Sequence, residues 1–345
     1  MSRASRLIMH CPCDRVLPES MDAESERALA ARVLGGEPRA VSRAISLIEE
    51  GVPEGARLVS ALFSHTGRAW VVGVTGPPGV GKSTLVDRVT KVFRSGGRRV
   101  GIVAVDPTSP FSGGAVLGDR VRMQTHAGDD GVFIRSMATR GRLGGLAQAT
   151  REATLVLDAA GHDVVFLETV GVGQAEVDIT YAADIAVVMV APGFGDDVQA
   201  IKAGILEIAD VFVVNKADHS GAEGTVAQLE AMLSLDEPSQ EHWRPPIVKT
   251  QATTGDGVND FVGALDRFRE YAGDDLRYQR RYRLEVSELR RLLGEAFWRH
   301  VEQLVSPSEL DKVTAQLARR ELDPYTAVDT IMNRVLAERD ADRKP

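Results

Sequence analysis

Cysteine is nearly absent from this chain of 345 residues. Its two cysteines, Cys11 and Cys13, both stand in the N-terminal sequence CPC. Two thiols cannot complete the four-ligand site of a structural zinc ion, and a pair of this kind belongs more often to a loose tail than to a metal or redox centre. We therefore expect two reduced thiols there and assign them no role.

Long apolar runs are also missing. No run reaches the roughly 18 residues that a transmembrane helix requires, and the apolar part of the N-terminus is too short and too broken for a secretory signal. An excess of positive charge is missing as well, because the net charge is −8. This balance disfavours nucleic acid or an anionic membrane as a partner. We therefore predict a cytoplasmic protein that binds neither nucleic acid nor membrane.

The middle of the chain alternates short apolar runs with amphipathic helical stretches. The runs are continuously apolar, which is typical of strands buried on both faces of a sheet. Helices between such strands predict an α/β fold with a mostly parallel, doubly wound sheet. The expected strands cover residues 70–75, 99–105, 163–168, 184–190, 210–215 and 246–250, with 131–135 as a further candidate.

Helical segments flank this sheet region on both sides. Before it, Val41, Ala44, Ile45 and Ile48 recur at helical spacing and form one apolar stripe. After Gly273 the composition shifts to charged residues in a helical pattern. The predicted domains are residues 1–65 (N-terminal helices), 66–272 (the α/β domain) and 273–345 (a C-terminal helical arm).

The C-terminal arm contains a well-marked helix start. Ser306 is an N-cap residue, Pro307 stands in the first turn, and Glu309 follows three residues after the cap. Later apolar positions such as Leu310 and Val335 give the arm a stripe but little core of its own. We expect an arm of this kind to pack either on the rest of its own chain or on a second subunit.

The sequence GPPGVGKST follows the first expected strand and matches the phosphate-binding pattern G-x-x-x-x-G-K-[ST]. In this pattern the glycines let backbone N–H groups surround the phosphates, Lys82 reaches the outer phosphates, and the Ser83 hydroxyl ligates magnesium. The predicted phosphate-binding residues are Gly76, Pro77, Pro78, Gly79, Val80, Gly81, Lys82, Ser83 and Thr84. The motif predicts a nucleoside triphosphate without saying which one.

The sequence NKAD ends a later strand and has the N-K-x-D pattern that recognises guanine in GTPases. A carboxylate at Asp218 can accept from N1–H and the N2 amine of guanine, whereas adenine has no matching pair of donors. In the loop TQATTGDG, after the last strand, the backbone N–H of Ala252 could meet the guanine carbonyl oxygen. The predicted guanine-binding residues are Asn215, Lys216, Asp218, Gln251, Ala252 and Thr253.

Carboxylates at the ends of two other strands predict a magnesium site. Glu168 ends one strand in ETVGVGQAE, where Gly171 could offer its N–H to the γ-phosphate. Asp106 and Asp119 lie in VDPTSPFSGGAVLGDR, after another strand. Since Mg²⁺ between β- and γ-phosphates needs few protein ligands and keeps several waters, we assign Ser83 and these three carboxylates to the metal. The predicted catalytic residues are Lys82, Asp106, Asp119 and Glu168.

Taken together, these motifs resemble the ArgK/MeaB group of P-loop GTPases. The matching sequences are GPPGVGKST, VDPTSPFSGGAVLGDR, TRGRLGGLA, ETVGVGQAE, APGFGDDVQAIKAG and NKAD. The similarity extends from about Val71 to about Phe261, and the helical flanks suit the group too. The resemblance implies a P-loop GTPase that binds GTP or GDP together with Mg²⁺.

The resemblance also implies partners. Members of the group are G-protein chaperones of adenosylcobalamin-dependent acyl-CoA mutases, methylmalonyl-CoA mutase above all. They couple GTP binding and hydrolysis to the delivery of intact cofactor and the removal of damaged cofactor. They are typically homodimers, and their C-terminal helices contribute to association. For this chain the resemblance therefore implies a mutase partner and a homodimer in which residues 273–345 take part.

The loop APGFGDDVQAIKAG resembles the third switch of the group, a segment that signals the nucleotide state to the mutase. Asp196, Gln199 and Lys202 fall on the group's functional positions there, so the resemblance gives them the coupling role. The chain departs from the group at Asp197, where glutamate is usual, and at the guanine loop TQAT. These departures bear on the details of the partner more than on the GTPase assignment.

The chain has no glutamine directly after Gly171, since Gln174 comes three residues later. We therefore expect slow GTP hydrolysis by the protein alone, and faster hydrolysis with a partner that orders the switch loops. Two alternatives remain open. One is a P-loop kinase, which ATP binding as tight as GTP binding would favour. The other is a metal-insertion GTPase, although His126 and His162 are isolated in the sequence.

Overall fold

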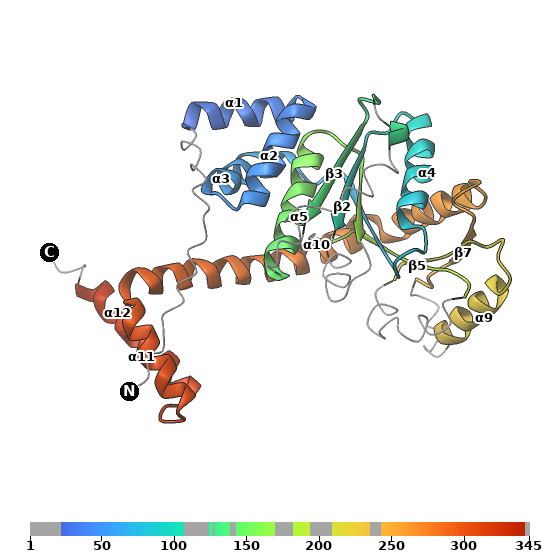
Figure 1. Ribbon diagram of the computed structural model, residues 1–345. Helices are drawn as coiled ribbons and strands as arrows, with labels where there is room; N and C mark the ends of the chain where they lie inside the picture. Colours follow the sequence, from blue (N-terminus) through green and yellow to red (C-terminus); the bar gives the residue numbers. More distant parts are fainter. Residues whose placement is uncertain are drawn as a thin grey trace, which may run out of the picture. The chain divides into compact units, whose positions relative to one another are not determined.

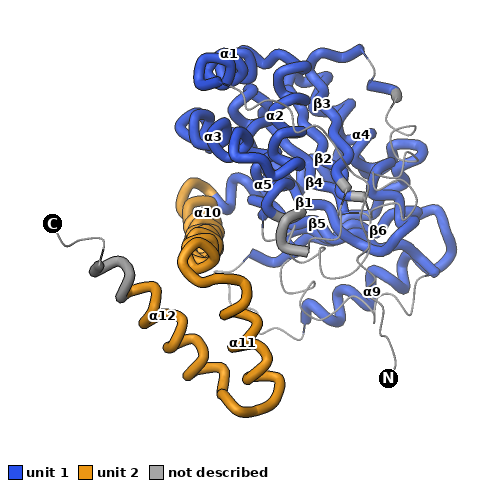
Figure 2. Tube along the Cα trace, turned by 60° about the vertical axis from the view of Figure 1, so that its left-hand side comes forward, with its two compact units in different colours: residues 1–272 blue, residues 273–345 orange. Residues whose placement is uncertain are grey.

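Figure 1 shows the computed structural model of the chain. The structure describes residues 22–106, 124–126, 128–138, 143–169, 182–193, 209–234 and 243–341. The chain divides into two compact units, residues 1–272 (unit 1) and 273–345 (unit 2), which are coloured separately in Figure 2. Within the described ranges, no helix is long and apolar enough to cross a membrane.

Unit 1 is built on a seven-stranded sheet with the strand order β3-β2-β4-β1-β5-β6-β7. The strands are β1 (Trp70–Thr75), β2 (Val100–Asp106), β3 (Val132–Ala138), β4 (Val164–Thr169), β5 (Ile185–Val190), β6 (Val211–Asn215) and β7 (Ile247–Thr250). All six pairings between neighbouring strands are parallel. Every residue of β4, β5 and β6 is buried, as their continuously apolar sequences predict. The predicted α/β fold class is confirmed.

Helices cover both faces of this sheet (Figure 1). The helices that begin in unit 1 are α1 (Ala23–Leu34), α2 (Pro38–Glu50), α3 (Pro53–Leu62), α4 (Lys82–Ser95), α5 (Leu143–Ala159), α9 (Ala222–Leu233) and α10 (Val258–Leu304), with 3-10 turns η1 (Phe63–His65) and η2 (Gln124–His126). On one face, Phe93 of α4 stacks on Phe166 of β4, with ring centroids 6.0 Å apart. On the other, Leu157 of α5 shares a core cluster with Val165 of β4. Since adjacent residues of a strand point to opposite faces, β4 is covered on both sides.

The N-terminal helices pack on the sheet through α5. Val41 and Ile45 of the predicted stripe on α2 are fully buried, and they belong to the same core cluster as Val156 of α5 and Met137 of β3. Burying an aliphatic side chain of this size stabilises a fold by about 1.5–3 kcal/mol. The segment that the sequence separates at residue 65 therefore shares one hydrophobic core with the α/β domain.

Unit 2 contains the remainder of α10 together with α11 (Pro307–Ala318) and α12 (Pro324–Ala341). Gly273 interrupts α10 where unit 2 begins, with φ 51° and ψ −158°. The predicted helix start is present, because the N–H of Ser306 donates to the Glu309 carboxylate at 3.2 Å. Glu309 also forms an ion pair with Arg334 of α12. The small core of this unit consists of Val301, Val305 and Val335.

A buried histidine lies between α5 and β4. His162 is 4% exposed, and its Nδ1 lies 2.9 Å from the carbonyl oxygen of Leu157. This contact makes Nδ1 the protonated nitrogen of a neutral ring. Burial is the main cause that lowers the pKa of His162 from 6.5 to about 4.

We predict that the free energy of unfolding falls as the pH drops from 6.5 to about 4, because the unfolded chain binds a proton at His162 that the folded protein rejects. The loss is at most about 1.4 kcal/mol per pH unit. The contribution of His162 is measured by denaturant unfolding of the wild type and of His162→Gln across this pH range. Carboxylates and the other histidines contribute equally to both proteins, so the difference between the two profiles reports His162. The variant should have the shallower pH dependence, and parallel profiles would contradict the prediction.

Candidate functional site

A pocket of about 540 Å³ lies at the edge of the sheet where β1, β4, β6 and β7 end. Its lining residues are Pro78, Gly79, Gly81, Lys82, Ser83, Thr84, Glu168, Thr169, Asn215, Lys216, Asp218, His219, Gln251, Ala252 and Thr253. Open parallel sheets bind their ligands at the carboxyl ends of the strands. The structure thus brings most of the predicted nucleotide-binding residues, from three separate segments, to one cavity together with Glu168.

The turn between β1 and α4 forms the phosphate-loop end of the pocket. Gly81 is the N-cap of α4 and has a left-handed backbone with φ 99°. The first N–H groups of a helix have no partner within the helix, and together with the helix dipole they attract anions such as phosphate. The Nζ of Lys82 donates to the carbonyl oxygens of Gly76 at 2.7 Å and Pro77 at 3.1 Å, so the ammonium group folds back over the loop.

Ser83 and Glu168 meet on the pocket wall. The hydroxyl of Ser83 donates to the Glu168 carboxylate, and both residues are buried. A hydroxyl and a carboxylate side by side are oxygen ligands of the kind that Mg²⁺ prefers, so these residues fit the metal. Within the described ranges, no group of three or more His, Cys, Asp or Glu residues could hold a metal ion. A Mg²⁺ ion here would complete its coordination with phosphate and water oxygens.

Asp106 ends β2 at the same edge of the sheet as Glu168. In the parallel register between β2 and β4, Ala104 pairs with Glu168 and Val105 pairs with Thr169. Asp106 therefore follows the last paired position by one residue. The predicted residues Asp119, Gly171, Asp196, Gln199 and Lys202, and the side chain of Asp106, lie outside what the structure describes.

The side chain of Asn215 joins the two ends of the pocket. Its Nδ2 donates to the carbonyl oxygen of Val80 in the phosphate loop at 2.7 Å. Its Oδ1 accepts from the hydroxyl of Thr250, which ends β7, and from the N–H of Ala252, each at 3.0 Å. Because Asn215 is only 3% exposed, these three hydrogen bonds are made away from water. One amide thus connects the phosphate loop to the loop after β7.

The remainder of the NKAD sequence turns at the rim of the pocket. Lys216 adopts a left-handed backbone with φ 57°, which is uncommon for a residue other than glycine. The side chain of Asp218 is 45% exposed, and its carboxylate lies 3.8 Å from Nε2 of His219. Both Asp218 and His219 line the pocket. A carboxylate placed on the wall with access to water can exchange that water for the donors of a bound base.

The loop after β7 differs in one respect from the prediction. Gln251 and Asp256 form a β-bridge that closes the loop, and Ala252 and Thr253 line the pocket as expected. The N–H of Ala252, however, which the sequence assigned to the guanine carbonyl oxygen, donates to Oδ1 of Asn215. The physical reason is that the buried side-chain oxygen of Asn215 needs donors, and the Ala252 N–H is one of the two that it finds.

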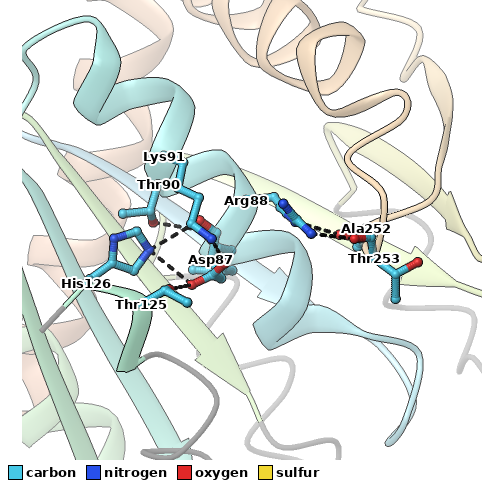
Figure 3. Close-up of polar contacts among 9 residues, drawn as sticks. Asp87, Arg88, Thr90, Lys91, Thr125, His126, Ala252 and Thr253 are labelled. Carbon is cyan, nitrogen blue, oxygen red and sulfur yellow. Dashed lines mark hydrogen bonds and ion pairs between the residues drawn. The ribbon is translucent and has the colours of Figure 1, made fainter.

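Arg88 on α4 is a contact of this loop that the sequence motifs did not reveal. Its Nε donates to the carbonyl oxygen of Ala252 at 3.1 Å, and its Nη2 donates to the carbonyl oxygen of Thr253 (Figure 3). The available signal was helical spacing, because Arg88 follows the pocket residue Thr84 by four positions and such positions share a helix face. Thr169 and His219 also line the pocket without having been predicted.

The two histidines considered as metal ligands lie elsewhere. Nε2 of His126 is 3.1 Å from Oδ1 of Asp87, on the opposite side of α4 from the Arg88 contacts (Figure 3). His162 is buried against the Leu157 carbonyl. The residues that line the nucleotide pocket include neither of them.

Comparison with protein families and curated proteins gives consistent matches. The family model described as methylmalonyl Co-A mutase-associated GTPase MeaB matches residues 41–305. The GTPase ArgK of Escherichia coli (strain K12) is 34% identical over 294 residues, which cover 83% of this chain and 88% of that protein. The mitochondrial Methylmalonic aciduria type A homolog of Mus musculus is 37% identical over 201 residues, covering 57% of this chain and 48% of that protein.

Two further similarities extend over nearly the whole chain. A protein of Pyrococcus abyssi whose name assigns it to the GTPases is 46% identical over 312 residues, which cover 89% of this chain and 96% of that protein. Among solved structures, the crystal structure of LAO/AO transport system kinase has a TM-score of 0.68 and 25% identity, covering 91% of this chain and 98% of that chain. The fold described above is thus also found in a solved structure.

Gly79 and Gly81 offer a matched pair of substitutions. Both have positive φ, 77° and 99°, but a Cβ at position 81 would lie 2.4 Å from Nδ2 of Asn215, whereas one at position 79 would meet nothing within 4 Å. We predict that Gly81→Ala lowers the free energy of unfolding by about 2 kcal/mol more than Gly79→Ala, because only the former displaces the buried amide. Denaturant unfolding of the nucleotide-free proteins measures the difference, and equal losses would refute it.

Proposed function

This chain belongs to the MeaB family of P-loop GTPases, and from this membership we propose that it is a cytoplasmic chaperone of an adenosylcobalamin-dependent acyl-CoA mutase. The family match over residues 41–305 confirms the resemblance stated from the motifs. The description of the family names methylmalonyl-CoA mutase as the associated enzyme. We propose that enzyme as the client, and that GTP binding and hydrolysis gate the loading, protection and reactivation of its cofactor.

The observation that carries the proposal is a pocket lined at one end by residues of the sequence GPPGVGKST and at the other by residues of NKAD. We propose that Lys82 exchanges its bonds to the loop carbonyls for phosphate oxygens, which are stronger partners for an ammonium group. We propose that Asp218 accepts from N1–H and the N2 amine of guanine, beside Asn215 and Lys216. Gln251, Ala252 and Thr253 would form the wall against the base.

Hydrolysis in such a site depends on positioning and on neutralising charge. We propose that Ser83 and Glu168 hold Mg²⁺, with Asp106 and Asp119 orienting its waters or the attacking water. The bound ion would supply positive charge that offsets the negative charge on the β- and γ-phosphates. The N-terminus of α4 and Lys82 add further positive charge there. We propose slow hydrolysis by the protein alone and faster hydrolysis when the mutase is bound.

A small-molecule kinase is the second candidate, because a solved structure that covers 91% of this chain is described as a LAO/AO transport system kinase. A kinase transfers the γ-phosphate to a second substrate, whereas a GTPase transfers it to water. Release of inorganic phosphate from GTP in the absence of any acceptor therefore separates the two candidates.

We propose that unit 2 forms the homodimer contact. Its part of α10 exposes a stripe of large apolar side chains, and Leu293 within it is 60% exposed. The members of the stripe are Leu289, Leu292, Leu293 and Phe297. Their spacing of three, four and eight residues from the first puts them on one helix face. Such a face in a symmetric dimer can be covered by the same face of a second copy.

We predict that Asp218→Asn weakens GDP and GTP binding about 100-fold and admits xanthosine nucleotides, because xanthine carries an oxygen in place of the N2 amine. Titration calorimetry with guanosine and xanthosine diphosphates measures both affinities. Asp260→Asn is the matched control, since Asp260 is exposed in the first turn of α10 and is not among the pocket residues. Unchanged GDP affinity in Asp218→Asn would show that Asp218 does not take part in guanine recognition.

We predict that the chain retains a methylmalonyl-CoA mutase in a pull-down whose yield differs between GTP and GDP, and that the mutase accelerates GTP hydrolysis. Alanine at Asp196, Gln199 and Lys202 together should abolish the acceleration while leaving GTP affinity unchanged, because the proposal gives these residues a coupling role only. Phosphate release with and without the mutase measures this. If the mutase stimulated the triple variant as much as the wild type, Asp196, Gln199 and Lys202 would have no role in coupling.

A further inference from the structure

We infer that Arg88 is a positioning residue for guanine recognition, which orients the backbone of residues 252–253 toward the base. The inference rests on the proposed guanine-nucleotide site and adds to it a residue outside the recognised motifs. Arg88 stands on α4, the helix whose first residues, Lys82 and Ser83, form the phosphate end of the pocket.

The guanidinium group of Arg88 holds two successive carbonyl groups. Nε donates to the oxygen of Ala252 at 3.1 Å, and Nη2 donates to the oxygen of Thr253. The N–H of Ala252 is held from the other side by Oδ1 of Asn215 at 3.0 Å. Ala252 is thus fixed at both its donor and its acceptor, and it is only 2% exposed. The loop cannot rotate these peptide groups without breaking at least one of the bonds.

The direction of these carbonyls decides which N–H faces the pocket. The peptide group between Ala252 and Thr253 is trans, so its C=O and N–H point in opposite directions. Because the Ala252 oxygen points toward Arg88 on α4, the Thr253 N–H points away from that helix. Thr253 lines the pocket, and within the described residues its N–H has no hydrogen-bond partner. Because the Ala252 N–H is already bonded to Asn215, the Thr253 N–H is the donor left on this part of the pocket wall for the guanine carbonyl oxygen.

The charge of Arg88 is directed at these carbonyls rather than at a carboxylate. Among the described residues Arg88 forms no ion pair. The carboxylate nearest in sequence, that of Asp87, lies on the other side of α4 and contacts Lys91 and His126 there (Figure 3). Hydrogen bonds from a charged donor are about twice as strong as those between neutral groups. Arg88 therefore ties the guanine loop to the phosphate helix and sets the separation between the two ends of the pocket.

The inference is tested by displacing fluorescent N-methylanthraniloyl-GDP with unlabelled GDP, inosine diphosphate and ADP. We expect Arg88→Ala to weaken GDP and inosine diphosphate about tenfold each, because both bases carry the oxygen that Thr253 would meet. The affinity for ADP, whose base lacks this oxygen, should remain as it is. The preference for GDP over ADP therefore falls about tenfold. Arg88→Lys keeps a charged donor and should restore part of the preference.

Arg94→Ala is the matched control. Arg94 is also on α4 and donates to Asp129 and to the carbonyl of Arg98, away from the guanine loop, so its loss should leave the GDP to ADP ratio unchanged. Unchanged GDP affinity in Arg88→Ala, or an equal loss for all three nucleotides, would overturn the inference. Wild-type protein that binds ADP as tightly as GDP would instead overturn the proposed function, so the two failures are distinguishable.

Discussion

The buried side-chain amide of Asn215 is the interaction on which the geometry of the site depends. A buried amide left without partners costs about 1–3 kcal/mol for each unsatisfied group, so the segments around it are held where its three hydrogen bonds require them. Val80, Thr250 and Ala252 are those partners. Val80 lies in the turn after β1, whereas Thr250 ends β7 and Ala252 follows it, so the partners come from two segments far apart in the sequence. The parallel sheet makes the meeting possible, because it brings the carboxyl ends of β1, β6 and β7 to one edge.

A second set of constraints comes from α4. Its first turn supplies Lys82 and Ser83 to the phosphate end of the pocket, and Arg88 reaches from the same helix to the loop after β7. Asn215 and Arg88 thus connect the same two ends of the cavity, one through a neutral amide and the other through a charged guanidinium. A nucleotide bound as proposed would meet partners that are already held at a fixed separation, which lowers the entropy lost on binding.

Local sequence patterns were sufficient for the fold and for most of the pocket. Buried parallel strands have continuously apolar sequences, so all seven strands could be predicted, and the spacing of glycines, Lys82 and Ser83 indicated the turn after β1. The partner of the Ala252 N–H and the contact of Arg88 could not be predicted in this way. The Arg88 bond to Ala252 joins residues 164 positions apart, and no local pattern records which of several donors a buried oxygen will use.

Asp87, the neighbour of Arg88 on α4, connects this helix to a third part of the chain. Asp87 accepts from Lys91 at 2.8 Å and from Thr125 at 2.5 Å, and Nε2 of His126 lies 3.1 Å from its carboxylate. Although burial acts in the opposite direction, the hydrogen bonds from Lys91 and Thr125 and the charge of Lys91 lower the pKa of Asp87, so it is ionised at neutral pH. Thr125 and His126 come directly after the segment that contains Asp119. Because Asp87 and Ser83 lie on the same helix, a displacement of α4 would move the pocket wall and the contact with Thr125 and His126 together.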